Sequence, residues 1–247
     1  MRLYLFPAMI LLAAASTSLT QERSRPRKVA PTEDYVTRSV EGWTVRVDKR
    51  LLDERKDLGN RSLKLLEKHL YDIGRLVPDP ACTALRRVPI WLAVDEGTGS
   101  GAEYHPSREW LEKNGHNPDK AKAVEIGIPE KFLRYSFDQP FMVLHELAHG
   151  YHDRELGFSD PRILEAYENA RKSGSYESVL FINGGKKRHY ALTDHKEYFA
   201  ESTEAFFGTN DFYPFVRAEL KEHDPGMFRL LEEIWRGRKK EGASERR

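Results

Sequence analysis

The sequence predicts a single α+β domain, with strands mainly in its first half and helices dominating its second half. Its 247 residues allow one domain of ordinary size with a sizeable core. Short apolar runs typical of strands come mostly before residue 130, and neither an internal repeat nor an interior linker divides the chain. We therefore expect residues 41–235 to fold as one domain.

Three strand patterns and two helix patterns make up the first half. Residues 42–47 (GWTVRV) alternate like a half-buried strand, and residues 88–94 (VPIWLAV) are typical of a buried one. Between them, apolar side chains recur every three or four positions over residues 63–77, which predicts a helix that two prolines end. A short helix follows at residues 107–115. The last strand, residues 123–128, either presents an edge to an extended peptide or is a fully paired core strand.

Helices dominate the second half. Asp138 is expected to cap the first of them, and Gly157 follows its end. Residues 176–192 are predicted to form a hairpin that turns at Asn183-Gly184-Gly185. The predicted helices cover residues 140–156, 161–173, 194–207 and 225–235.

The N-terminus is typical of a secretory signal peptide. Arg2 precedes an uncharged apolar run over residues 3–15, and small residues follow at 16–18. The alternative is an uncleaved anchor, but the run is shorter than the about 20 apolar residues that a membrane span needs. We expect residues 1–20 to be removed, the mature protein to be secreted or periplasmic, and no stable membrane insertion to remain.

Charge is unevenly distributed along the chain. The formal net charge is +1, yet residues 21–40 carry five basic and three acidic side chains, and residues 236–247 carry six and two. With Arg2 also basic, residues 41–235 hold six more acidic than basic side chains. The net negative charge of residues 41–235 argues against a nucleic-acid-binding protein with a broadly basic surface. We expect residues 21–40 to be a disordered polar leader and residues 236–247 a disordered basic tail.

Cys82 is the single cysteine of the sequence. One cysteine excludes an intramolecular disulfide, a cluster of cysteine metal ligands and a CxxC redox pair.

The most informative motif is HELAH at residues 145–149, within the predicted helix over 140–156. His145 and His149 are one helical turn apart on one face, so both imidazoles can reach a single zinc ion. Glu146 lies beside them, where a carboxylate can act on a water molecule at the metal. The alternative is a pair of surface histidines beside a solvated glutamate, which the apolar surroundings disfavour.

A third protein ligand must come from elsewhere. Glu155 lies six residues after His149, but the glycine turn that this geometry needs is missing, and His152 points to a different side than His145. Glu197 and Glu201 share one face of the helix over 194–207. Each glutamate also has an alternative interpretation: Glu197 can form a capping box with Asp194, and Glu201 can be a charged residue exposed to solvent. Spacing alone therefore does not decide whether either of them is the third ligand.

Two separated motifs carry a resemblance to a known family. HELAH at 145–149, followed by Tyr190 and by EYFAE at 197–201, resembles the lethal-factor-like zinc metallopeptidases, the family of the anthrax toxin lethal factor catalytic domain. The resemblance implies a zincin-like fold, Glu197 as the third zinc ligand, and Tyr190, seven residues earlier, facing the metal. The chain has no room for the toxin's partner-binding or translocation domain, so toxicity and host substrates are not carried over.

These observations predict a secreted zinc metalloendopeptidase with one Zn²⁺ per chain, acting on an extended peptide or protein substrate. Zinc would activate a water molecule, with Glu146 as general base, and Tyr190 would stabilise the oxyanion. Glu201 would accept a hydrogen bond from a ligand imidazole. The alternatives are a zinc-binding secreted interaction module without turnover, which retention of Glu146 disfavours, and a zinc hydrolase of a non-peptide amide. Five further histidines, His105, His116, His189, His195 and His223, are expected to be structural or at the surface, with His105 also a candidate for lining the cleft.

Overall fold

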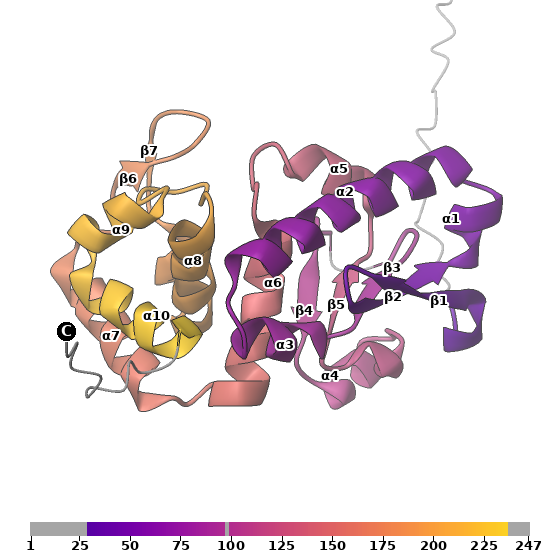
Figure 1. The fold of residues 1–247 in the computed structure, drawn as a ribbon, viewed down its shortest axis with the longest axis horizontal. Helices are drawn as coiled ribbons and strands as arrows, with labels where there is room; N and C mark the ends of the chain where they lie inside the picture. The colour runs from indigo at the N-terminus through magenta and orange to yellow at the C-terminus, as the bar shows by residue number, and fades with distance from the viewer. Residues whose placement is uncertain (1–28, 97–98, 237–247) are drawn as a thin grey trace, which may run out of the picture.

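The computed structural model describes residues 29–96 and 99–236, which form the predicted α+β fold (Figure 1). A mixed sheet occupies the first half of the chain, with strand order β1-β2-β3-β5-β4. β2, β3 and β5 are parallel to one another, whereas β1 and β4 run antiparallel to their neighbours. The strands are β1 (Tyr35–Val40), β2 (Trp43–Asp48), β3 (Ile90–Leu92), β4 (Glu103–His105) and β5 (Ala123–Ile126).

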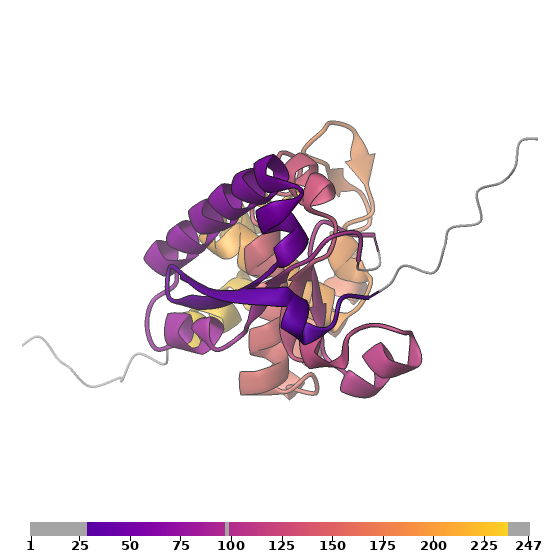
Figure 2. The same ribbon diagram turned by 90° about the vertical axis from the view of Figure 1, so that its right-hand side faces the viewer.

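Helices cover the sheet and continue as a helical group in the second half. The long helix α2 lies along the sheet and buries Leu66, Leu70 and Ile73, as their spacing predicted (Figure 2). α6 lies between the sheet and the group of α7 to α10, and it packs against α8 (Figure 1). The helices are α1 (Lys49–Asp53), α2 (Lys56–Leu76), α3 (Ala81–Arg86), α4 (Arg108–Lys113), α5 (Pro129–Tyr135), α6 (Met142–Tyr151), α7 (Pro161–Ser173), α8 (His195–Phe207), α9 (Arg217–His223) and α10 (Pro225–Arg236).

The fold begins earlier than the sequence predicted. Residues 35–40, expected within a disordered leader, form β1 and pair along their whole length with β2. The turn between the strands places Glu41 and Gly42 at positive φ, a geometry typical of tight hairpins. Ahead of β1, the backbone N–H of Ala30 donates to buried Glu96 at 2.9 Å. The prediction of disorder was therefore wrong for residues 30–40, because the mostly polar, exposed face of β1 hides its pairing.

β5 resolves the alternative left open for residues 123–128. It pairs with β3 on one side and β4 on the other, so it is a paired core strand, not an edge that could receive a peptide. All four residues of β5 are buried. β4 is the strand at this end of the sheet.

The second half follows the predicted order with local differences. The HELAH helix begins at Met142 instead of residue 140, and Asp138 does not cap it, because the N-cap position is occupied by Phe141, three residues later. A π-helical turn, His152–Leu156, continues α6 up to Gly157, where φ is +79°. Asp160 caps the N-terminus of α7, and Gly174 ends the helix in the left-handed conformation.

The predicted hairpin is much shorter than expected. Only β6 (Val179–Leu180) and β7 (Lys186–Lys187) pair as strands. Tyr190, expected on a hairpin strand, instead begins a 3₁₀ turn, Tyr190–Leu192, in which Nδ1 of His189 accepts a hydrogen bond from the backbone N–H of Ala191. The predicted signal peptide and residues 237–247 of the tail lie outside the described residues.

None of the helices in the described ranges is both long and apolar enough to cross a membrane.

Candidate metal centre

α6 presents both histidines of the HELAH motif on one side. Its other faces bury Val143, Leu144 and Leu147 in the core, which fixes the helix and directs His145 and His149 towards α8. The two imidazole ring centroids lie 4.7 Å apart, and both side chains are almost fully buried. This is the arrangement that the four-residue spacing predicted.

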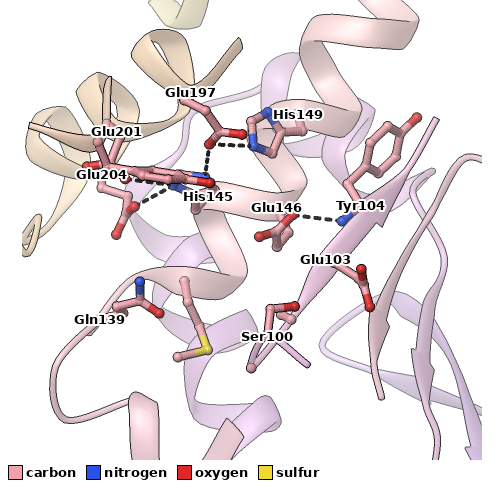
Figure 3. A pocket seen from close by; sticks show the side chains of 14 residues that line it. Ser100, Glu103, Tyr104, Gln139, His145, Glu146, His149, Glu197, Glu201 and Glu204 are labelled. Carbon is pink, nitrogen blue, oxygen red and sulfur yellow. Dashed lines mark hydrogen bonds and ion pairs between the residues drawn. The ribbon is translucent and has the colours of Figure 1, made fainter. Parts of the chain in front are cut away.

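α8 supplies the carboxylate that faces this pair. Asp194 caps the helix by accepting N–H bonds from Lys196 at 2.8 Å and Glu197 at 3.0 Å. The Glu197 carboxylate turns to the histidines, with Oε2 at 3.0 Å from Nε2 of His145 and 3.3 Å from Nε2 of His149. Asp194 therefore caps the helix as the sequence suggested, whereas the side chain of Glu197 lies at the histidines (Figure 3).

These three side chains could hold a metal ion. One donor atom from each of His145, His149 and Glu197 lies within 4.8 Å of the others, and two imidazoles with one carboxylate form a donor set that zinc commonly takes. Burial opposes a charge on His145, but hydrogen bonds with Glu197 and Glu204 raise its pKa well above the usual value. Burial lowers the pKa of His149. Burial also disfavours the charged carboxylate of Glu197, but the two histidines outweigh this effect and lower its pKa.

A second glutamate of α8 orients the first histidine, and it is not the one predicted. Nδ1 of His145 lies 2.7 Å from Oε1 of Glu204, whereas Oε1 of Glu201 is 3.6 Å away, beyond hydrogen-bond distance. The expectation that Glu201 makes this bond was therefore wrong. Seven residues along a helix return to within about 20° of the starting direction, against about 40° for four residues, so Glu204 lies closer than Glu201 to the direction of Glu197.

Glu146 lies beside the three candidate ligands with its carboxylate held from the sheet. Its Oε2 accepts a hydrogen bond from the backbone N–H of Tyr104 on β4 at 2.7 Å (Figure 3). Burial raises the pKa of this carboxyl to about 8, and the nearby charge of Glu197 adds to the effect of burial. Such a carboxyl group can accept or release a proton near neutral pH.

Tyr190 shares the cavity with these residues. Its side chain is 48% exposed, and burial of the remainder raises the pKa of the phenol. The cavity has a volume of about 330 Å³ and lies between β4 with its preceding loop, α6 and α8. Its walls include all six residues singled out from the sequence: His145, Glu146, His149, Tyr190, Glu197 and Glu201.

The other candidate ligands lie elsewhere. Glu155 pairs with Arg87 at 2.6 Å, and neither ring nitrogen of buried His152 has a hydrogen-bond partner among the described residues. His105 is not part of the cavity wall; its Nε2 lies 2.7 Å from Oε2 of buried Glu125. The sequence-based exclusion of Glu155 and His152 therefore agrees with their positions.

Comparisons of the chain with protein-family models, with curated proteins and with solved structures find no match.

Proposed function

We propose that this protein is a zinc-dependent metallopeptidase with a zincin-like fold. The single observation that carries the proposal is that His145, His149 and Glu197 converge beside Glu146 in one cavity. The resemblance of the two motifs to lethal-factor-like peptidases supports the same assignment. The sequence of residues 1–20 supports export of the protein.

His145, His149 and Glu197 would hold the zinc ion. When bound, zinc supplies Lewis acidity, which makes a water molecule reactive near neutral pH. Glu204 would keep the proton of His145 on Nδ1, so that Nε2 remains free to act as a ligand.

The proton transfers fall to Glu146. Its carboxylate would take a proton from the water molecule as that water attacks the peptide carbonyl carbon, and would then give the proton to the departing amine. The phenol of Tyr190 would donate a hydrogen bond to the oxyanion.

Glu146→Gln tests this proposal. The substitution keeps the size of the side chain but removes its capacity to take a proton, so we expect zinc content to stay at one per chain. Cleavage of a diverse peptide library should fall by at least about a hundredfold. Mass spectrometry of the digested library and metal analysis of both proteins give the two readouts.

Three other results would contradict the proposal. Equal cleavage by both proteins would remove Glu146 from the mechanism. Bound zinc without cleavage of any peptide would favour the interaction module, and turnover of non-peptide amides alone would favour a different zinc hydrolase.

A further inference from the structure

Tyr104 contacts both α6 and the π-helical turn that continues it. Its backbone N–H donates to Oε2 of Glu146 at 2.7 Å, and its phenol donates to Oδ2 of Asp153 at 2.7 Å. Asp153 lies in the π-helical turn that continues α6, and it faces the same side of this segment as Glu146, since both residues accept a hydrogen bond from Tyr104. One tyrosine of β4 thus spans two turns of the segment that carries the HELAH motif.

A glycine between these two contacts lets the ring approach the helix. Gly150 lies four residues after Glu146, on the same side, and a Cβ atom there would lie 3.2 Å from Cε2 of Tyr104. The same Cβ would lie only 2.9 Å from Cγ2 of Val88, closer than real Cβ contacts. The absence of a side chain at position 150 therefore allows Tyr104 to pack directly onto α6.

Further polar contacts fix β4 relative to α6. The backbone N–H of Lys122 donates to the carbonyl oxygen of His105 at 2.6 Å, and Nζ of Lys122 pairs with Oδ2 of Asp153, also at 2.6 Å. The imidazole of His105 contacts Glu125 of the neighbouring strand. Asp153 therefore accepts a hydrogen bond from the Tyr104 phenol and pairs with Nζ of Lys122. These two contacts link the β4–β5 end of the sheet to the segment that follows α6.

We propose that Tyr104 is the positioning residue of Glu146: its phenol, anchored on Asp153 across Gly150, holds the strand whose N–H orients the Glu146 carboxylate. This proposal rests on the proposed function for its catalytic consequence. Among the described residues, the hydrogen bonds of Tyr104 go to Glu146 and Asp153, and none joins it to His145, His149 or Glu197, so we expect it to act on Glu146 and not on the metal ligands. If β4 shifts, the N–H group of Tyr104 moves with it. The Glu146 carboxylate is then no longer aligned with the water molecule whose proton it takes in the proposed mechanism.

Tyr104→Phe keeps the ring and the backbone N–H but loses the phenol anchor. We expect kcat to fall about ten- to a hundredfold, since small displacements of a reacting group have effects of this size. KM and zinc content should stay unchanged. Tyr176→Phe is the matched control, because it also removes a hydrogen bond from tyrosine to aspartate, here Asp224, away from Glu146. A fall in kcat of the same size in the control would overturn the proposal.

Asp153 variants separate positioning from a general structural effect. Asp153→Asn keeps an oxygen that can accept a hydrogen bond from the phenol. Its kcat should therefore stay close to that of the wild type, whereas Asp153→Ala should have a lower kcat. Equal losses of kcat in both variants, or a change in KM without a change in kcat, would contradict a positioning role.

Hydrogen exchange at the Tyr104 amide tests the geometry independently of activity. We expect exchange in the full chain to be at least about threefold faster in Tyr104→Phe and in Glu146→Ala than in the wild type, because each change loosens the N–H bond. Unchanged exchange in Tyr104→Phe would overturn the proposal, whatever the activity. If the wild type cleaves no peptide, the proposed function fails, and amide exchange alone decides whether Tyr104 positions Glu146.

Discussion

At the scale of single residues, the sequence identified those site residues that belong to one short motif. His145, Glu146 and His149 were identified from one motif, because a helix converts their spacing directly into a shared position. Glu197 could not be separated from a helix cap by spacing alone, and its contact with the histidines depends on how α8 packs against α6. Sequence spacing shows which residues share a face, but not which of them a neighbouring helix reaches.

Glu204 illustrates the residue that the sequence prediction missed. It lies seven positions after Glu197, and the only available signal was that this spacing returns nearly to the same direction on a helix. Its carboxylate and that of Glu201 are both buried, and one oxygen of each lacks a hydrogen-bond partner among the described residues. Of these two carboxylates, however, only that of Glu204 lies within hydrogen-bond distance of His145.

Glu204→Ala should weaken zinc binding about ten- to a hundredfold, the usual effect of losing a carboxylate that orients a ligand imidazole. Competition of the protein with a zinc-binding dye measures this change. Glu201→Ala, on the same helix face, is the control and should have a smaller effect. The assignment would be reversed if Glu201→Ala weakened zinc binding and Glu204→Ala did not.

At the scale of elements, long amphipathic helices were predicted well, whereas most short helices were not; α4 is an exception, because Ser107 caps its start as predicted. α2, α7, α8 and α10 carry apolar residues at helical spacing or bounding residues that end a helix. α1, α3, α5 and α9 have five to seven residues each, too few to show a period, and their positions depend on tertiary packing. β4 has only three residues, although it holds Glu146.

The N-cap of α8 couples helix stability to the metal site. Asp194→Ala removes the acceptor of the Lys196 and Glu197 N–H groups, so we expect it to cost about 1 kcal/mol of stability. It should also weaken zinc binding, because the first turn of α8 carries Glu197. Thermal unfolding and zinc titration measure the two effects.

Asp160→Ala is the matched control for this cap. Asp160 caps α7 through the N–H of Arg162 and lies outside the cavity. It should lower stability by a similar amount without changing zinc affinity. Equal zinc affinity in Asp194→Ala and the wild type would show that the cap does not support the site.

For the whole molecule, the proposed metal joins two segments that are distant in the sequence. His149 and Glu197 are 48 positions apart, and Cys82, buried in α3, is the single cysteine, so no intramolecular disulfide can make such a link. The overall class and the order of the predicted elements followed from the sequence. The position of α8 against α6 did not, because it is decided by the packing of buried side chains such as Phe199 and Ala200.

Removing the metal should therefore destabilise the fold. A ligand that binds only the folded state adds about 4 kcal/mol when its concentration is a thousand times its Kd. We expect a chelator to lower the Tm of the wild type and to leave the Tm of His145→Ala unchanged. Calorimetry with and without chelator measures both values, and an equal Tm for the wild type under the two conditions would argue against a metal link between α6 and α8.

The most direct test of the central claim is the zinc affinity of Glu197→Ala relative to the wild type, measured on the full chain. Loss of a carboxylate ligand should lower zinc affinity by at least about a hundredfold, with the protein still folded, while the wild type binds one zinc ion per chain. If Glu197→Ala retains zinc with wild-type affinity, the assignment of His145, His149 and Glu197 as one metal centre is contradicted.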